Sequence, residues 1–340
     1  MTETERPDDP SLRTALNRVP GIGRLSLLLI PALALAMALV FPFPVHGRHW
    51  GPLFDLAHAP SFFAVFVCIA AMLDPRAAGG ANGSTALWPL NLPRLILLAA
   101  VLCGIGIVCE LAQQLVARQP SVGDVAANCV GLLAGFFWCA GRRVIRRRDR
   151  ILLAAIVPAL IAIPCINPVL ELQECRKQSQ EFPLLVSFER DRELSVWTPH
   201  EADLQPTTDW SSDGKRSLQI RVKTSTGLPG ASFVWPVADW TGYSEFAFEI
   251  RNPETRDLTM GIGLSDRLYA DSGFDPTDRF RRTIEIPSQS TLTVHIALSE
   301  IASAPASRRM NLREIAMVDL YLPDSTPGTV VLLDNLRLTR

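Results

Sequence analysis

The second half of this 340-residue chain contains no cysteine, because all seven cysteines lie at or before position 175. A domain formed by that half cannot be held together by disulfides and needs a conventional hydrophobic core. Cys165 and Cys175 could form a disulfide if both lie outside the cell, or they could remain two separate thiols. The formal net charge is only −1, so the charge balance points neither to nucleic acid nor to an acidic substrate.

The sequence also lacks a recognisable enzyme motif. It contains no nucleophile–base pattern, no glycine-rich loop for phosphate and no cluster of metal ligands at an interpretable spacing. Whether the protein is an enzyme therefore stays open at this stage.

What the chain has instead is two unlike halves. From residue 21 to about residue 170 it consists of long apolar runs, and beyond residue 180 it is polar and rich in Thr, Ser and Asp. About 20 apolar residues cross a bilayer as a helix. Five segments meet that test: residues 25–45, 52–73, 95–116, 122–140 and 151–170. The first is long and has no small-residue cleavage site, so we expect a retained helix and not a signal peptide.

Arginines predict the orientation of these helices, because basic residues collect on the cytoplasmic side. Four arginines precede the first helix, and six lie between residues 142 and 150, after the fourth. The loops on the opposite side hold only Arg48 and Arg118. We therefore expect a cytoplasmic N-terminus, five crossings of a bacterial inner membrane and an extracytoplasmic C-terminal half. An even number of crossings would place that half in the cytoplasm, but it would require discarding the apolar run at 151–170.

Seven polar residues stand out in and between the second, third and fourth apolar segments. These candidate site residues are Asp55, His58, Glu110, Gln113, Arg118, Asp124 and Asn128. With a rise of ~1.5 Å per residue, His58, Glu110 and Asn128 all lie about 9–10 Å below the outer surface. Spacings of three or four residues place the members from each helix on one face. We therefore expect three helices to bring polar groups together in the outer half of the bundle.

Two interpretations of this polar cluster stay open. It can be a buried charge network that fixes the register of the helices, since ionisable groups in hydrocarbon cost roughly 2.5–3.5 kcal/mol each and seek partners. It can also be a functional site, in which His58 acts as acid or base and is oriented by Asp55. In that case Glu110 and Arg118 would hold a polar lipid head group.

The same residues resemble a known family. The order Asp55-x-x-His58, Glu110-x-x-Gln113, Arg118, Asp124, Asn128 and Gly131 is similar to that of the VanZ-like family of bacterial membrane proteins, named for a protein associated with teicoplanin resistance. The resemblance covers about residues 21–143. It implies an integral membrane protein of the cell envelope whose reaction is not established, and a role related to glycopeptide resistance. The chain departs from the family at residues 59–63, where Ala-Pro-Ser-Phe-Phe replaces the usual aromatic residue and glycine after the histidine.

The second half reads as short apolar–polar alternations with turn residues every 8–12 positions, which is typical of a β-sandwich. The alternation is clearest at residues 218–222 and 246–250. The predicted strands are 184–189, 217–223, 231–236, 245–251, 259–264, 279–286, 292–297, 316–322 and 330–338.

The strings LLVSFE (184–189), WTGYSEFAFEIRNP (240–253) and LLDNLRL (332–338) resemble the galactose-binding-like jelly rolls found among carbohydrate-binding modules. The resemblance covers about residues 182–340. It implies a structural calcium ion bound by Glu189 and Asp334, although calcium needs six to eight oxygen ligands and the sequence offers only these two carboxylates. It also implies glycan binding through aromatic faces. Most of the large aromatics should lie in the core, and Tyr269 and Phe274, in the loop LYADSGFDPTD, are the better candidates for exposed glycan-binding residues.

The predicted fold class is thus multi-domain: an α-helical transmembrane bundle of five helices followed by an all-β jelly-roll sandwich. We expect a cytoplasmic tail (1–24), a transmembrane domain (25–170), a linker (171–182) and an extracytoplasmic domain (183–340). The partners are the lipid bilayer and, through the outer domain and the polar cluster, a cell-wall glycan or a lipid-linked precursor, with no nucleic acid. The alternatives are an enzyme or transporter-like site within the bundle and a purely structural envelope protein.

Overall fold

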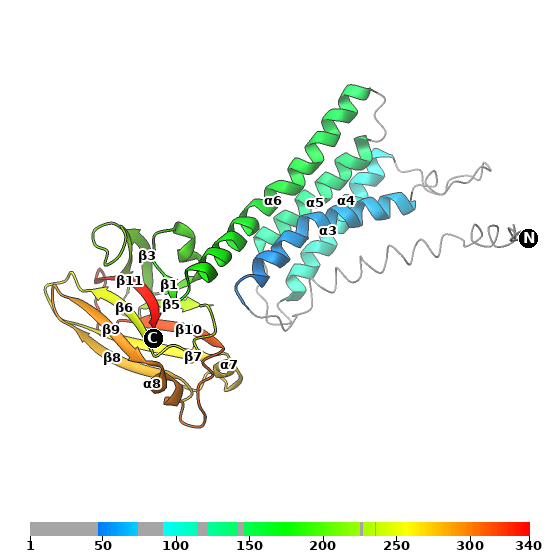
Figure 1. The fold of residues 1–340 in the computed structure, drawn as a ribbon. Coiled ribbons are helices and arrows are strands. Elements are labelled where there is room, and N and C mark those ends of the chain that lie inside the picture. Colours follow the sequence, from blue (N-terminus) through cyan, green and yellow to red (C-terminus); the bar gives the residue numbers. More distant parts are fainter. Residues whose placement is uncertain (1–46, 74–90, 114–120, 142–145, 225–226, 235) are drawn as a thin grey trace, which may run out of the picture. The chain divides into compact units, whose positions relative to one another are not determined.

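The computed structural model describes residues 47–73, 91–113, 121–141, 146–224, 227–234 and 236–340 (Figure 1). Contacts divide the chain into two compact units with a boundary between Leu170 and Glu171, and residues 47–49 belong with the second unit. The predicted tail and the predicted helix at 25–45 lie outside the described residues. The number of five helices and their orientation therefore stay predictions.

Within the described residues, four helices are long and apolar enough to span a membrane. They are α3 (Trp50–Leu73), α4 (Leu92–Ala112), α5 (Val122–Gly141) and α6 (Arg147–Glu181), of which α6 continues into the second unit. Large apolar side chains on α4, such as Leu97, Ile105 and Val108, are more than half exposed. Such a surface is unfavourable in water and suits the interior of a lipid bilayer, which suggests a membrane protein.

Two glycines on α5 let its backbone approach α3 closely. A Cβ atom on Gly131 would lie 2.3 Å from the carbonyl oxygen of Ala59, and one on Gly135 would lie 2.9 Å from Phe66. Small residues at such positions allow the tight helix packing found in membranes.

Residues 171–182, for which the sequence predicts a linker, continue α6 as far as Glu181. This polar part of the helix belongs to the second unit, and ion pairs join it to the residues that follow. Arg190 contacts Glu174 and Glu181, and Glu171 accepts from Arg192.

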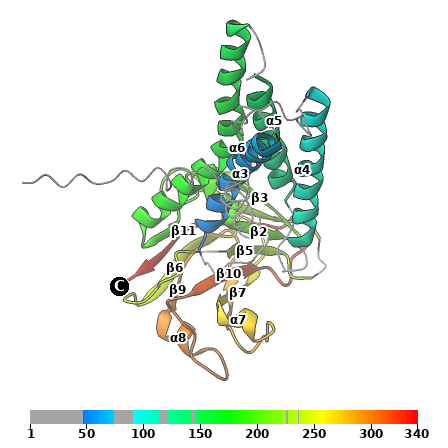
Figure 2. The same ribbon diagram turned by 90° about the vertical axis from the view of Figure 1, so that its right-hand side faces the viewer.

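The second unit is a sandwich of two antiparallel sheets (Figure 2). The first sheet has the order β3-β4-β11-β6-β9, with β1 also paired to β11, and the second has the order β2-β5-β10-β7-β8. The strands of the first sheet are β1 (Leu184–Val186), β3 (Ala202–Thr207), β4 (Ser217–Val222), β6 (Glu245–Arg251), β9 (Thr291–Ala297) and β11 (Val330–Thr339). Those of the second are β2 (Trp197–His200), β5 (Gly230–Val234), β7 (Leu258–Asp266), β8 (Phe280–Ile286) and β10 (Ile315–Tyr321). Three short helices connect them: η3 (Asp191–Val196), α7 (Leu268–Asp271) and α8 (Leu298–Ser303).

The strand order is that of a jelly roll. Strands β4-β11-β6-β9 face strands β5-β10-β7-β8, so the chain passes from sheet to sheet at almost every connection, as two Greek keys require. The core between the sheets contains Phe233, Trp240, Phe246 and Phe280, each at most 1% exposed. This core fulfils the expectation that a cysteine-free half is held by apolar packing.

Candidate functional site

Part of the predicted polar cluster does meet inside the bundle. His58 on α3 faces α5 with both ring nitrogens: Nδ1 lies 2.9 Å from Oδ1 of Asn128, and Nε2 lies 3.7 Å from Oδ2 of Asp124. Glu110 on α4 brings a carboxylate oxygen to the same place, so that the ligand atoms of His58, Glu110 and Asp124 all lie within 4.8 Å of one another. His58, Glu110 and Asn128 are 2–3% exposed, and the side chain of Asp124 is 15% exposed.

Helix packing explains why these residues meet. Gly131 packs closely against the backbone of Ala59. Ala59 follows His58 directly, and Gly131 lies one helical turn after Asn128, so this packing brings the two polar side chains together. On α4, a Cβ atom on Gly106 would lie 3.1 Å from the ring of Phe62 and 3.6 Å from Nδ2 of Asn128. Small residues on both α4 and α5 thus leave room for the polar side chains between the helices.

The other predicted members of the cluster are placed differently. Gln113 is buried at the C-terminal cap of α4, Asp55 is exposed one turn before His58, and Arg118 lies outside the described residues. Both ring nitrogens of His58 contact residues of α5, with Nδ1 hydrogen-bonded to Asn128, and the orienting role of Asp55 stays a prediction. A functional role of the seven residues stays a prediction.

Glu189 and Asp334, the predicted calcium ligands, hold the same loop from two sides. Oε1 of Glu189 accepts the backbone N–H groups of Lys215 and Arg216, and Oδ2 of Asp334 accepts those of Ser212 and Asp213. These hydrogen bonds, with that from Lys215 first, lower the pKa of Glu189, whereas burial raises the pKa of Asp334.

The loop therefore turns hydrogen-bond donors toward both carboxylates, while a calcium ion would need oxygen ligands there. The arrangement fits direct hydrogen bonding of the 212–216 loop by the two carboxylates better than a calcium site. Within the described residues, Glu189 and Asp334 belong to no group of three clustered His, Cys, Asp or Glu side chains. The calcium ion stays a prediction that these contacts do not favour.

The two predicted glycan-binding aromatics differ in exposure. Tyr269 is only 7% exposed, contrary to the sequence-based expectation, because its hydroxyl donates to the carbonyl of Phe274 and its ring lies under the guanidinium of Arg279. Phe274 is 63% exposed and packs edge-on against Tyr269. A role in glycan binding stays a prediction for Phe274.

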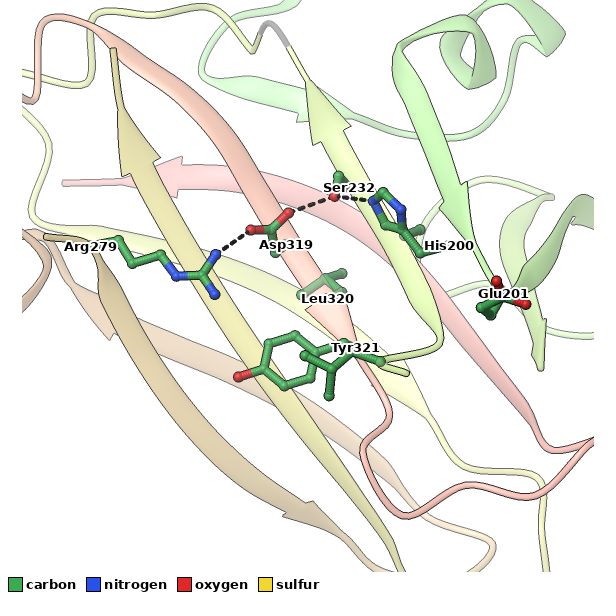
Figure 3. A pocket seen from close by; sticks show the side chains of 9 residues that line it. His200, Glu201, Ser232, Arg279, Asp319, Leu320 and Tyr321 are labelled. Carbon is green, nitrogen blue, oxygen red and sulfur yellow. Dashed lines mark hydrogen bonds and ion pairs between the residues drawn. The ribbon is translucent and has the colours of Figure 1, made fainter. Parts of the chain in front are cut away.

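The structure shows a different recess, on the outer face of the second sheet. A cavity of about 300 Å³ lies over strands β2, β5 and β10, and Figure 3 shows its lining. Tyr321, which lines the recess, is paired with a glycine on each neighbouring strand: Gly230 on β5 and Gly261 on β7. A Cβ atom on Gly261 would lie 2.1 Å from the ring of Tyr321, so the ring lies flat over that glycine.

A row of hydrogen-bonded polar side chains crosses this recess from strand to strand (Figure 3). His200 Nε2 lies 2.7 Å from Ser232 Oγ, Ser232 Oγ lies 2.5 Å from Asp319 Oδ1, and Arg279 Nη1 lies 3.0 Å from Asp319 Oδ2. Ser232 has one hydroxyl hydrogen, and the carboxylate can only accept it. His200 must therefore donate through Nε2, and in the neutral ring Nδ1 is then an acceptor.

Sequence reasoning missed this recess, although a signal exists. Gly261 and Gly263 alternate within one strand and thus lie on the same face, and so do Asp319 and Tyr321. Glycine at alternating strand positions marks a place where something approaches the backbone closely.

Comparisons with known proteins give no family for this chain. No family model matches the chain, and no curated protein matches it. Among solved structures, the family 11 carbohydrate-binding module from Clostridium thermocellum, in complex with a beta-1,3-1,4-mixed-linked tetrasaccharide, is similar with 16% identity and a TM-score of 0.35, covering 46% of this chain and 94% of that chain. The CBM22-1 xylan-binding domain from Paenibacillus barcinonensis Xyn10C is similar with 16% identity and a TM-score of 0.33, over 46% and 94% of the two chains. An exo-beta-agarase is similar with 17% identity and a TM-score of 0.37, over 46% of this chain and only 24% of the agarase.

Proposed function

We propose that this protein is a multi-pass membrane protein that binds a glycan through its jelly roll. If the sandwich lies outside a bacterial cell, as the arginines predict, the ligand would be a cell-wall glycan or a lipid-linked precursor. The helical bundle would then be VanZ-like. The observation that carries the proposal is the recess of the second sheet, in which a flat tyrosine ring adjoins a row of hydrogen-bonding side chains.

The chemistry of the recess suits a sugar. A pyranose ring has flat C–H faces, which stack on an aromatic ring, and equatorial hydroxyls, which both donate and accept. Tyr321 is half-buried and offers a ring face. The exposed His200 offers the acceptor Nδ1, and Arg279 offers donors that are not used by Asp319. Because Ser232, Asp319 and Arg279 restrain one another, these groups are fixed before the ligand arrives, which lowers the entropic cost of binding.

Glycan binding by the purified full-length protein in detergent tests the proposal. Wild type should retain oligosaccharides on a glycan array or bind cell-wall fragments in a pull-down. Tyr321→Ala should lower the affinity by about tenfold or more, because it removes the stacking surface. The matched control is Phe274→Ala, which removes the exposed aromatic of the other candidate site. Loss of binding in the control alone would place the site at the 266–278 loop, and no binding by wild type would contradict the proposal.

Orientation needs its own measurement, since the glycan must lie on the side of the membrane where the sandwich lies. In a cysteine-free variant of the full chain, a single cysteine at the exposed Glu201 should react with a membrane-impermeant maleimide in intact cells. Labelling only after lysis would place the sandwich in the cytoplasm.

A second candidate function lies in the bundle. The convergence of His58, Glu110, Asp124 and Asn128 favours a membrane-embedded site that acts on or transports a polar lipid head group. In that case Glu110→Gln and His58→Ala would remove a glycopeptide-related phenotype without lowering the abundance of the protein in the membrane.

A further inference from the structure

Three side chains of metal-ligating type meet in the bundle, each from a different helix. The ligand atoms of His58, Glu110 and Asp124 lie within 4.8 Å of one another, and this is the one such group of three in the part of the chain that the structure describes. A tetrahedral ion with ligand distances of about 2.0–2.2 Å holds its ligand atoms about 3.4 Å apart. The separation of 3.7 Å between His58 Nε2 and Asp124 Oδ2 is already close to that value. We propose that His58, Glu110 and Asp124 bind a divalent first-row metal ion such as Zn²⁺.

Asn128 fixes the tautomer of the His58 imidazole that can bind a metal ion through Nε2. Its amide oxygen, 2.9 Å from His58 Nδ1, accepts the hydrogen of that nitrogen. The neutral ring then carries its lone pair on Nε2, the nitrogen that faces Asp124. Metal-bound histidines almost always donate their other ring N–H to such an acceptor, which fixes the tautomer and the ring orientation.

Electrostatics supply an independent argument. Glu110 is 3% exposed and Asp124 is largely buried, so two carboxylates lie close together between membrane-spanning helices. Two anions at this distance repel each other, and placing each of them in hydrocarbon is unfavourable. A divalent cation between them neutralises both at once. A proton shared by the carboxylates, or the guanidinium of Arg118, would be the alternative source of neutralisation, and the experiment below distinguishes them.

The ligand types define the class of ion. One imidazole nitrogen and two carboxylates suit zinc, manganese or ferrous iron, and no thiolate belongs to the group. Three protein ligands leave a coordination position for water or for an anionic group. This inference stands apart from glycan binding by the sandwich, because it concerns other residues and is measured by metal content.

Metal binding by the purified full-length protein is the direct test. The protein in detergent is freed of metal with a chelator and then titrated with Zn²⁺ by calorimetry, and with Co²⁺ by absorbance. We expect one high-affinity ion per chain. The Co²⁺ spectrum should show visible bands of a nitrogen and oxygen site without a near-ultraviolet sulfur-to-cobalt band, which distinguishes this site from adventitious binding by the seven cysteines.

Variants assign the ligands. Glu110→Gln and His58→Gln should each abolish high-affinity binding, and Asn128→Ala should weaken it by roughly 10–100-fold, as loss of such a supporting partner does. Two controls should leave binding unchanged: Asp149→Asn, an exposed acid on α6, and Cys103→Ser, whose sulfur lies 3.4 Å from that of Cys129. Gel filtration of each variant shows whether it is folded.

Three results would overturn the proposal. One is a metal-free wild type that binds neither ion, which would leave a proton or Arg118 as the neutralising group. Another is high-affinity binding that survives in folded Glu110→Gln and His58→Gln. The third is a Co²⁺ spectrum dominated by thiolate bands. Because the wild-type titration decides the first and third points, the test does not depend on the variants folding.

Discussion

The ring of Tyr321 occupies the space that a side chain on Gly261 would need: a Cβ atom there would lie 2.1 Å from Cε2 and Cζ of the ring. Strands β10 and β7 are paired at these two residues, so the contact is between direct neighbours in the sheet. The orientation of the tyrosine, and with it the stacking surface of the proposed glycan site, depends on the absence of one methyl group.

Gly261→Ala should therefore displace the ring and impair glycan binding while the sandwich still folds. Overpacking of this kind typically costs about 1–3 kcal/mol, and here the ring can rotate outward. Gly263→Ala is the graded control, because its Cβ atom would meet Asp319 at 3.3 Å, a much milder contact. Glycan affinity and thermal unfolding of both variants check the prediction. Equal affinity in wild type and Gly261→Ala would show that the flat ring is not needed.

Most elements of this fold follow from local sequence patterns, and a few do not. The three apolar segments that form α3, α4 and α5 were predicted to within a few residues, because hydrophobic length is a local property. The end of α6 was not: residues 171–181 are polar and gave no apolar signal, although Glu, Gln and Lys are good helix formers. Strands β2 and β3 were missed because each contains a proline, Pro199 or Pro206. Both are edge strands, where a missing N–H costs no ladder hydrogen bond.

The sites depend on distances that the sequence does not contain. The polar cluster could be predicted because each helix carries its polar residues at helical spacing and at a similar depth. The geometry of the proposed metal ligands could not be predicted, because the three ligands come from three helices and no local sequence spacing indicates that they meet. The recess on the sandwich joins His200 to Asp319, 119 positions apart, through a strand that was not predicted.

Gly131→Ala should destabilise the bundle, because its Cβ atom would lie 2.3 Å from a backbone oxygen, which cannot move aside as a side chain can. We expect a loss of about 1–3 kcal/mol, seen as a lower unfolding temperature in detergent. Gly104→Ala is the matched control: its Cβ atom would meet nothing within 4 Å, and alanine favours the helix by about 1 kcal/mol. Similar melting of the two variants would contradict the close contact between α3 and α5.

Arg308 should contribute much more to stability than an ordinary surface cation. It forms a two-pronged contact of 2.6 and 2.7 Å with Asp266, whose side chain is fully buried, and it also contacts Asp278. Arg308→Ala leaves a buried charge without its partner, which typically costs about 3–5 kcal/mol. Lys223→Ala, which breaks the exposed pair with Asp203, should cost less than about 1 kcal/mol. Denaturant unfolding followed by tryptophan fluorescence compares the two, and equal losses would contradict the prediction.

Glu189 should make the stability of the sandwich depend on pH in the acidic range. The backbone N–H of Lys215, followed by that of Arg216, lowers the pKa of Glu189 below its ordinary value of 4.5. A carboxyl group with a lowered pKa in the folded state stabilises the fold above its ordinary pKa, and this stabilisation is lost as the pH falls through the lowered value.

Glu189→Gln should therefore be less stable than wild type at pH 7, by about 1 kcal/mol for hydrogen bonds to a charged acceptor, and the difference should shrink as the pH falls below 4.5. Asp191→Asn is the control, since the side chain of Asp191 is 84% exposed and its ion pair with Arg216 is screened by water. Unfolding temperatures between pH 7 and pH 3 give the comparison. A difference that stays constant over this range would show that Glu189 acts through packing alone, and that the charge of its carboxylate does not hold the 212–216 loop.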